Sequence, residues 1–326
     1  MGIDILNIKP SVISRDLKGK YVLLYGKPKS GKTTAAASFP KTLLCAFEKG
    51  YNAIAGVRAA DILKWSDFKL ILRQLESPEA HEIYETIVID TVSIAYDLCE
   101  QFVCAQNGVQ TIGDIPYGRG YTVCKKEFEN ALRKITQMGY GLVLIAHSAS
   151  HIEKLADGTE TEVISPELPK RAAEICNGLV DILGYIGTEY VDGEPQQWLY
   201  TRPTSTLFAG SRFKYLAPKV KFGYNELVKA ISDAIDEAER NGATVVDTAE
   251  IKTAETLDFN QVRAEALDLW NKLVKPNSEN PNTEMANAIL KKAEMIFGRR
   301  IKLSEITEDQ VDLMNLLVVD MRDLAK

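Results

Sequence analysis

The sequence contains no uninterrupted apolar run long enough to span a membrane, and its first ten residues lack the charged-then-apolar pattern of a secretory signal. It has five cysteines among 326 residues, and none of them forms a C-x-x-C pair. Their odd number argues against a disulfide framework. We therefore expect a protein of a reducing cytoplasm with no membrane partner.

The overall composition, with 45% hydrophobic and 26% charged residues, is typical of a globular protein. A length of 326 residues suits one large domain and a small one. The net charge is −6, but basic residues are concentrated locally. Residues 195–225 contain no acidic residue and carry Arg202, Arg212, Lys214, Lys219 and Lys221. Such a patch on an acidic protein either binds nucleic acid or is an ordinary solvated face.

One stretch, GKPKSGKTT at residues 26–34, fits the pattern G-x-x-x-x-G-K-[ST]. The chemistry explains these residue types, because successive backbone N–H groups must wrap a phosphate chain and a side chain would intrude where glycine stands. Lys32 can reach the outer phosphates, and the Thr33 hydroxyl can ligate Mg²⁺. The predicted nucleotide-binding residues are Gly26, Lys27, Pro28, Lys29, Ser30, Gly31, Lys32, Thr33 and Thr34.

The segments around this loop predict the fold. An apolar run at residues 21–25 precedes the loop, and the alanine-rich segment after it is expected to form a short helix that ends at Pro40. Further apolar runs at residues 43–47, 86–89 and 139–148 alternate with stretches of helical periodicity. This alternation predicts an α/β domain with a mostly parallel central sheet flanked by helices. The alternative for the loop alone is a surface turn between a strand and a helix.

Three polar side chains, Glu48, Asp90 and His147, each follow an apolar run, and the carboxyl ends of parallel strands share one edge of a sheet. We expect Asp90 to hold Mg²⁺ together with Thr33, because this hard cation prefers oxygen ligands. Asp90 is followed by Thr91 rather than by a second acid. Glu48 is therefore the predicted base that activates water, with a salt-bridging acid as the alternative. His147 is either a sensor of the γ-phosphate or an ordinary strand-end histidine.

This arrangement resembles the RecA-type ATPase core over about residues 18–240. The resemblance rests on GKPKSGKT, on Glu48 in LLCAFEKG, on Asp90 in IVIDT and on His147 in LVLIAHS. It implies a RecA-like P-loop NTPase core that uses ATP and Mg²⁺, with Lys32, Glu48 and His147 in the catalytic site. The sequence is most similar to small phage-encoded members that act in recombination and strand annealing. That likeness implies a ring or filament of copies acting on single-stranded DNA in the cytoplasm of a host cell.

Arg212, in AGSRFKY, is the candidate for an arginine that one subunit supplies to the phosphoryl group of its neighbour. Arg202 and Lys214 are rivals for this role, and a plain surface arginine is the alternative. The sequence departs from the family pattern in two places. The sensor position is His147 where relatives often have glutamine, and Gly210 stands where some relatives have a lysine.

The resemblance also places DNA contacts in two loops, here near residues 106–121 and 148–172. The first is rich in glycine, and the second is polar over residues 149–170 and expected to be mobile. Aromatic side chains can stack on bases while cations contact phosphates, although acids in the second loop oppose this. The candidate DNA-binding residues are Tyr117, Arg119, Tyr121, His151, Lys154, Lys170 and Arg171.

Local patterns predict further elements. Amphipathic spacing over residues 61–76 and helical periodicity over residues 92–105 and 122–138 predict three helices. The dipeptide at Asp192 and Gly193 predicts the turn of a β-hairpin.

Three domain segments are predicted: the ATPase core at residues 1–243, a linker at residues 244–258 and a small helical domain at residues 259–326. The last segment lies outside the resemblance and contains three helical stretches with apolar faces. These faces either pack on one another or on the core, or they bind a single-strand-binding protein or another replication partner.

Taken together, the motifs predict a Mg²⁺-dependent ATPase that single-stranded DNA stimulates. Two alternatives share the same loop. A small-molecule kinase would transfer the phosphoryl group to a bound hydroxyl, and a nucleotide-gated loading scaffold would bind ATP without hydrolysing it. Tyr51 and Asn52, just after Glu48, are candidates for contact with adenine.

Overall fold

A computed structural model describes residues 12–14, 19–154, 158–246, 257–275 and 281–325. The chain divides into two compact units, one formed by Pro10–Thr253 and one that contains Ala254–Lys326. Each unit has its own hydrophobic core. No helix in the described ranges is long and apolar enough to cross a membrane.

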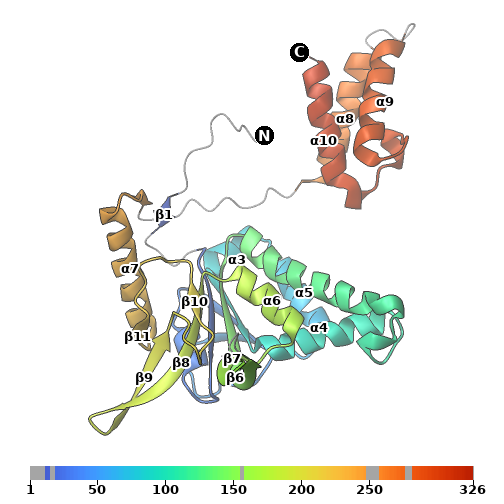
Figure 1. Ribbon diagram of the computed structural model, residues 1–326. Helices are drawn as coiled ribbons and strands as arrows, with labels where there is room; N and C mark the ends of the chain where they lie inside the picture. Colours follow the sequence, from blue (N-terminus) through green and yellow to red (C-terminus); the bar gives the residue numbers. More distant parts are fainter. Residues whose placement is uncertain (1–11, 15–18, 155–157, 247–256, 276–280, 326) are drawn as a thin grey trace. The chain divides into compact units, whose positions relative to one another are not determined.

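The first unit is built on a sheet that has ten strands among the described residues, with the order β11-β9-β8-β2-β6-β5-β3-β4 and with β10 beside β8 and β7 beside β6 (Figure 1). The strands from β8 to β4 along this order are parallel to one another, and β9 pairs antiparallel with both β8 and β11. Their bounds are β2 Tyr21–Gly26, β3 Thr42–Ala46, β4 Arg58–Asp61, β5 Thr86–Asp90, β6 Gly141–Lys154, β7 Glu160–Pro166, β8 Ile182–Val191, β9 Glu194–Tyr200, β10 Gly210–Ser211 and β11 Lys219–Lys221.

Helices cover both faces of this sheet, which is why the central strands are apolar throughout. Leu23 and Tyr25 of β2 face one core, which includes side chains of the helices α2, α4, α5 and α6. Val22 and Leu24 face the other core, which includes side chains of α1 and α7. The helices are α1 Lys32–Ala37, α2 Trp65–Gln74, α3 Pro78–Ile83, α4 Val92–Gln106, α5 Arg119–Gln137, α6 Lys170–Leu179 and α7 Tyr224–Arg240. This architecture confirms the predicted α/β class with a mostly parallel central sheet flanked by helices.

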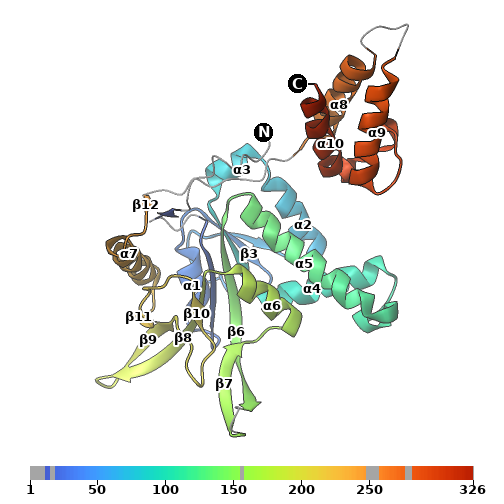
Figure 2. The same ribbon diagram turned by 45° about the horizontal axis from the view of Figure 1, so that its top comes forward.

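The strands on either side of β2 continue past it as two projecting hairpins, hereafter the β6–β7 arm and the β8–β9 arm (Figure 2). Strand β6 pairs with β2 as far as His147 and then pairs with β7 alone up to Lys154. The expectation of a mobile loop over residues 149–170 is therefore wrong. The polar composition that indicated a loop also suits a two-stranded arm with solvent on both sides.

The β8–β9 arm has the predicted turn. Asp192 and Gly193 lie at φ 54° and φ 86°, the left-handed pair that a two-residue hairpin turn requires. Strand β8 pairs with β2 as far as Ile186, and residues 187–191 pair only with β9.

Two other local expectations need correction. The stretch at residues 106–121 is not an open loop, because it contains two short 3₁₀ turns, Ile112–Asp114 and Pro116–Gly118, and α5 already begins at Arg119. Residues 61–76 contain the predicted helix α2, but the short strand β4 that ends at Asp61 was not expected. Its two alanines have a higher intrinsic propensity for a helix than for a strand, so the local sequence does not predict β4.

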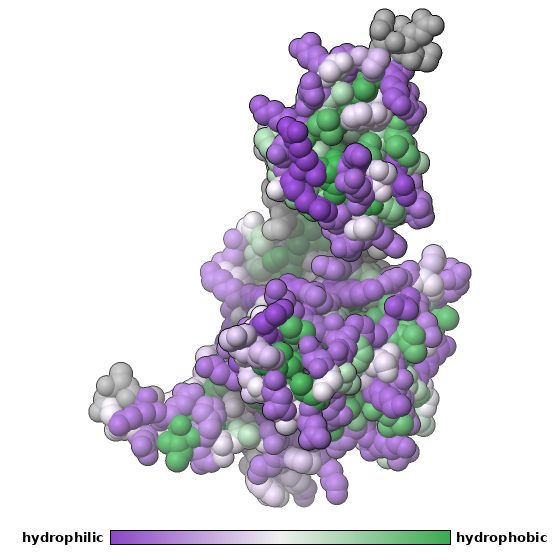
Figure 3. Space-filling view, turned by 90° about the vertical axis from the view of Figure 1, so that its right-hand side faces the viewer, coloured by the Kyte–Doolittle hydropathy of each residue, from purple (hydrophilic) through white to green (hydrophobic). Residues whose placement is uncertain are grey.

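The second unit consists of the helices α8 Phe259–Val274, α9 Thr283–Phe297 and α10 Val311–Leu324, as the apolar periodicity predicts. The side chains of Asp258 and Asn282 accept backbone hydrogen bonds at the starts of α8 and α9. The face of this unit in Figure 3 shows hydrophobic residues scattered among hydrophilic ones. Of the expected linker, Val245 and Val246 form strand β12, which pairs with β1 at Ile13–Ser14, and residues 247–256 lie outside the described ranges.

Candidate functional site

The stretch of residues 27–31 leaves the end of β2 and turns directly into α1. Gly31 lies at φ 78° and Lys29 at φ 64°, so the backbone makes the left-handed turns that such a loop needs. A Cβ on Gly26 would lie 2.8 Å from the carbonyl oxygen of Ile186 on the neighbouring strand β8. Glycine at this position is therefore required by close packing of the loop against the sheet.

Lys32 is buried, and its ammonium group closes the loop on itself. It donates hydrogen bonds to the carbonyl oxygens of Gly26, at 2.9 Å, and Lys27, at 2.8 Å. Burial lowers the pKa of Lys32, and the nearby carboxylates of Asp90 and Glu48 act in the opposite direction. A buried cation whose acceptors are neutral carbonyl oxygens is stabilised further when anionic oxygens replace them, because hydrogen bonds between charged groups are stronger.

Thr33 and Asp90 meet at the same edge of the sheet. The Thr33 hydroxyl donates to Asp90 Oδ2 at 2.7 Å. Burial raises the pKa of the Asp90 carboxyl, and the bond from Thr33 partly offsets that rise. A Cβ on Gly50 would lie 3.7 Å from Thr33 Oγ1 and 3.9 Å from Asp90 Oδ2, so the backbone at Gly50 lies close beside this pair.

Glu48 and His147 form a second pair beside the first. Glu48 Oε2 and His147 Nε2 are 3.3 Å apart. The backbone N–H groups of Phe47 and Glu48 donate to the carbonyl oxygen of Asp90 at 2.7 and 3.0 Å, which holds the end of β3 against the end of β5. The Nδ1 atom of His147 is buried and has no hydrogen-bond partner in the described structure.

These residues fit a nucleotide with Mg²⁺. The described residues contain no cluster of three or more His, Cys, Asp or Glu side chains that could hold a metal alone. A hydroxyl and a carboxylate in contact suit Mg²⁺ in the form that keeps waters and takes its other oxygens from phosphates. On this chemistry Thr33 and Asp90 would be the ligands from the chain, and phosphate and water oxygens would complete the coordination.

A model of the AAA domain family matches residues 18–213. The chain belongs to this family. It is also 31% identical over 341 residues to the SPbeta prophage-derived uncharacterized protein YorG of Bacillus subtilis (strain 168), with 99% of each chain covered. The AAA domain includes the phosphate loop, Glu48, Asp90 and His147, so the site lies entirely within the part that defines the family.

Two solved structures are similar at a much lower level. The KaiC-like protein PH0186 of Pyrococcus horikoshii OT3 is 15% identical, with a TM-score of 0.35, over 64% of this chain and 88% of that one. The flagellar accessory protein FlaH of Methanocaldococcus jannaschii is 11% identical, with a TM-score of 0.34, over 63% and 85% of the two chains.

Arg212 does not lie near the phosphate loop of its own chain. Its guanidinium contacts Asp181 Oδ1 at 2.9 Å and the carbonyl oxygen of Gly178 at 2.6 Å, at the edge of the sheet where β2 and β8 begin. Arg202 donates to the carbonyl oxygens of Ser211, Phe213 and Lys214 and so fixes the backbone that carries Arg212. Of the two arginines, Arg212 is the one whose side chain is more than half exposed, at 57%.

The candidate DNA-binding residues fall into three places. Tyr117 is 99% exposed in the turn before α5, and His151 lies on the β6–β7 arm, where it contacts Glu153 at 2.9 Å. Arg171, at the start of α6, stacks 4.3 Å over the ring of Tyr121. This contact joins the first turn of α5 to the start of α6. Arg119 lies next to Tyr117, Lys154 lies on the β6–β7 arm with His151, and Lys170 lies next to Arg171. All three of these basic side chains are exposed.

Two side chains near the loop were not expected from the sequence. A Cβ on Gly31 would lie 3.5 Å from Phe222 Cε1 and 3.8 Å from Gln197 Oε1. Both residues come from the antiparallel end of the sheet, more than a hundred positions along the chain, and no motif marks them. Tyr51, a candidate for adenine contact, donates instead to Asp61 Oδ1 at 2.7 Å.

Proposed function

We propose that this protein binds and hydrolyses ATP with Mg²⁺ and acts on single-stranded DNA as an oligomer in phage recombination or replication. The observation that carries the ATPase part is the convergence of Lys32, Thr33, Asp90, Glu48 and His147 at one edge of the sheet. The match to a prophage-derived protein over 99% of the chain supports the phage setting.

Each side chain has a role that follows from its contacts. Lys32 would exchange two carbonyl acceptors for phosphate oxygens, and Thr33 and Asp90 would hold Mg²⁺, which neutralises charge on the phosphates. Glu48 is 45% exposed, so a water molecule can reach its carboxylate. The water oxygen attacks the γ-phosphorus, and the Glu48 carboxylate accepts the proton that this water loses. The bond between the γ-phosphorus and the leaving ADP oxygen breaks in the same step.

His147 links this chemistry to the β6–β7 arm. It contacts Glu48 through Nε2, and its backbone carbonyl accepts a 2.8 Å hydrogen bond from Glu167, just beyond the arm. Residues 148–154 continue directly from it as one strand of the arm. If the contacts of Glu48 change during turnover, a shift of His147 would therefore displace the first strand of the arm directly.

The DNA part of the proposal is supported by the exposed aromatic and cationic side chains at two of the three places. Tyr117 offers a fully exposed ring, and Arg171 on Tyr121 offers a cation over a second ring. The arm itself carries Glu153, Glu160 and Glu162 and is a poorer surface for a phosphate backbone.

The test is phosphate release with and without single-stranded DNA. Lys32→Ala and Glu48→Gln should each lower the rate roughly 10²-fold or more, because one removes the phosphate contact and the other the base. Lys64→Ala and Glu79→Gln, at exposed positions on other elements, are the matched controls.

The outcome separates the alternatives. A rate that DNA leaves unchanged and that a small hydroxyl compound raises would favour a kinase. Tight ATP binding without turnover in the wild type would favour a scaffold, and wild-type turnover in Glu48→Gln would remove Glu48 as the base.

A further inference from the structure

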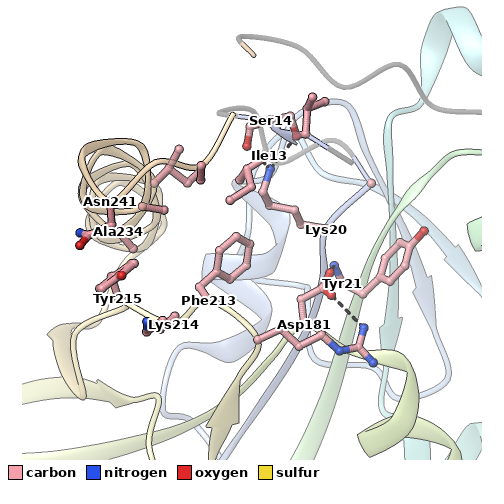
Figure 4. Close-up of a pocket in the computed structure, with 16 residues that line it drawn as sticks. Ile13, Ser14, Lys20, Tyr21, Asp181, Phe213, Lys214, Tyr215, Ala234 and Asn241 are labelled. Atoms are coloured by element: carbon pink, nitrogen blue, oxygen red, sulfur yellow. Dashed lines mark hydrogen bonds and ion pairs between the residues drawn. The ribbon is translucent and has the colours of Figure 1, made fainter. Parts of the chain in front are cut away.

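A cavity of about 600 Å³ lies at the edge of the sheet opposite to the phosphate loop (Figure 4). Its walls come from β1, the start of β2, the segment 212–215 and helix α7. The side chain of Phe213 points into the space between α7 and Ile13. The lining is largely apolar, with Ile13, Phe213, Tyr215, Ala234 and Ile235 among its residues.

Lys214 gives the rim of this cavity an exposed cation. Lys20 and Arg212 also line the cavity, but Lys20 is buried and donates to Ser14, and Arg212 is paired with Asp181, the single carboxylate among the described lining residues. Lys214 is exposed and lies 5.0 Å from the centre of the Tyr215 ring. The cavity therefore suits an apolar or aromatic group that carries negative charge beside it.

The tip of the β8–β9 arm has this character. Tyr190 is 77% exposed and Val191 is 42% exposed, next to the exposed acids Asp192 and Glu194. The arm extends five residues past the last β8 pairing with β2, which is about 16 Å at the usual rise of a strand. Tyr190 and Val191 therefore offer an exposed aromatic ring and an exposed aliphatic side chain at the end of the arm, and tyrosine is among the residues that most often anchor protein contacts.

We propose that the tip of the β8–β9 arm of one copy docks in this cavity of a second copy. The two surfaces match in character, since Tyr190 and Val191 fit the apolar lining and Glu194 faces Lys214. They lie at opposite ends of strand β8, so they cannot meet within one chain. A contact between different patches on identical chains is heterologous and continues from copy to copy into a ring or a filament.

This inference rests on the self-assembly in the proposed function and names the surface that carries it. Arg212 lines the cavity, whereas the phosphate loop lies at the base of the arm that docks there. Docking therefore brings Arg212 of one copy toward the phosphate-loop edge of the next.

The experiment measures the mass in solution of the full chain, which is 36.2 kDa as a monomer. Wild type should form assemblies of several chains. Tyr190→Ser with Val191→Ser, hereafter the tip variant, and Lys214→Glu, the cavity variant, should each fall to the mass of one chain. Leu63→Ser is the matched control, because Leu63 is 72% exposed on another part of the surface.

Mixing the two variants gives a sharper result. The tip variant keeps an intact cavity and the cavity variant keeps an intact tip, so an equimolar mixture should form dimers and nothing larger. Glu194→Lys and Lys214→Glu combined in one chain should restore the wild-type mass, since the charges are exchanged. A reciprocal, isologous pairing of the same two surfaces would instead stop at the mass of a dimer in the wild type.

A cross-link provides an independent measurement. All five native cysteines are buried, so cysteines introduced by Val191→Cys and Ala238→Cys are the accessible thiols. A short bis-maleimide should join a Val191→Cys chain to an Ala238→Cys chain and should not join two Val191→Cys chains. Assembly of both tip and cavity variants at wild-type mass would overturn the proposed interface alone. A wild type that stays monomeric with ATP and DNA would overturn self-assembly itself.

Discussion

The hydroxyl of Thr33 and the carboxylate of Asp90 are joined by a 2.7 Å hydrogen bond across 57 positions of the sequence. This contact closes the space between the phosphate loop after β2 and the end of β5. It links two motifs that the sequence shows only as separate segments, and it places both ligands predicted for Mg²⁺ in one place.

Asp90→Asn tests this pair. Asparagine keeps an oxygen that can accept from Thr33 but removes the negative charge, so the local packing should survive while the hold on Mg²⁺ weakens. We expect phosphate release to fall roughly 10²-fold and to need more Mg²⁺ for half-maximal rate. A Mg²⁺ titration of the rate measures this. Asp61→Asn, at the end of β4, is the control, and an unchanged titration in Asp90→Asn would contradict the assignment.

Two helical glycines give opposite predictions for stability. A Cβ on Gly120 in α5 would lie 2.5 Å from the carbonyl oxygen of Ile112, whereas a Cβ on Gly178 in α6 meets nothing within 4 Å. Gly120→Ala should therefore lower the free energy of unfolding by about 1 to 3 kcal/mol through overpacking. Gly178→Ala should raise it by about 0.5 to 1 kcal/mol, because alanine restricts the unfolded chain and favours the helix.

Urea unfolding followed by circular dichroism measures both variants. The comparison is internal, since the same substitution is made in two helices of one unit. If both variants changed the free energy of unfolding equally and in the same direction, the structure would have to accommodate the added methyl group beside Ile112 without loss of stability.

The buried thiols predict a pH dependence. Burial raises the pKa of Cys45 and of Cys176 from 9.0 to about 12. A raised thiol pKa contributes stability that is present below pH 9 and is lost as the pH rises toward 12, because the unfolded chain ionises first. The free energy of unfolding should fall by about 1 kcal/mol per pH unit for each thiol in that window.

Labelling with a thiol reagent at pH 8 gives the complementary measurement. The folded protein should react at none of its five cysteines on the time scale in which the urea-unfolded chain reacts at all five. Rapid labelling of the folded protein would show that the cores of the first unit open far more often than their packing indicates.

The sequence was sufficient for the parts of the site that lie at strand ends. Lys32, Glu48, Asp90 and His147 were placed together because buried parallel strands end at a common edge, and that rule depends only on recognising the apolar runs. The hydrogen bonds from Phe47 and Glu48 to the carbonyl of Asp90 could not be foreseen. They depend on the path of the backbone after β3, and the pattern of side chains in the sequence does not predict that path.

The β6–β7 arm and the neighbours of Gly31 were missed for a different reason. Residues 148–166 are polar and turn-rich, and the strands of this arm are exposed toward the tip, so they show little of the apolar alternation that marks a strand. Phe222 reaches the loop only because the sheet brings β9 and β11 back beside β8. Its position depends on long-range strand pairing rather than on any local signal.

The role of Arg212 is tested by mixing two defective chains. Arg212→Ala removes the guanidinium but leaves its own phosphate loop intact, whereas Lys32→Ala removes the loop lysine but leaves Arg212. If Arg212 acts on the neighbouring site, each variant alone should be nearly inactive and the mixture should recover activity at the interfaces that combine an intact loop with an intact arginine. Loss of the pair with Asp181, which is largely exposed on the arginine side, should cost less than about 1 kcal/mol of stability.

The control mixture combines Lys32→Ala with Glu48→Gln, because both changes damage the loop side of the site and no interface in the mixture has both residues intact. Phosphate release by each mixture is compared with that of the separate chains, and the mass in solution confirms that every mixture assembles. Recovery in the Arg212→Ala mixture alone would place the arginine in the neighbouring site. Equal failure of both mixtures, at wild-type mass, would leave Arg212 as the partner of Asp181 and nothing more.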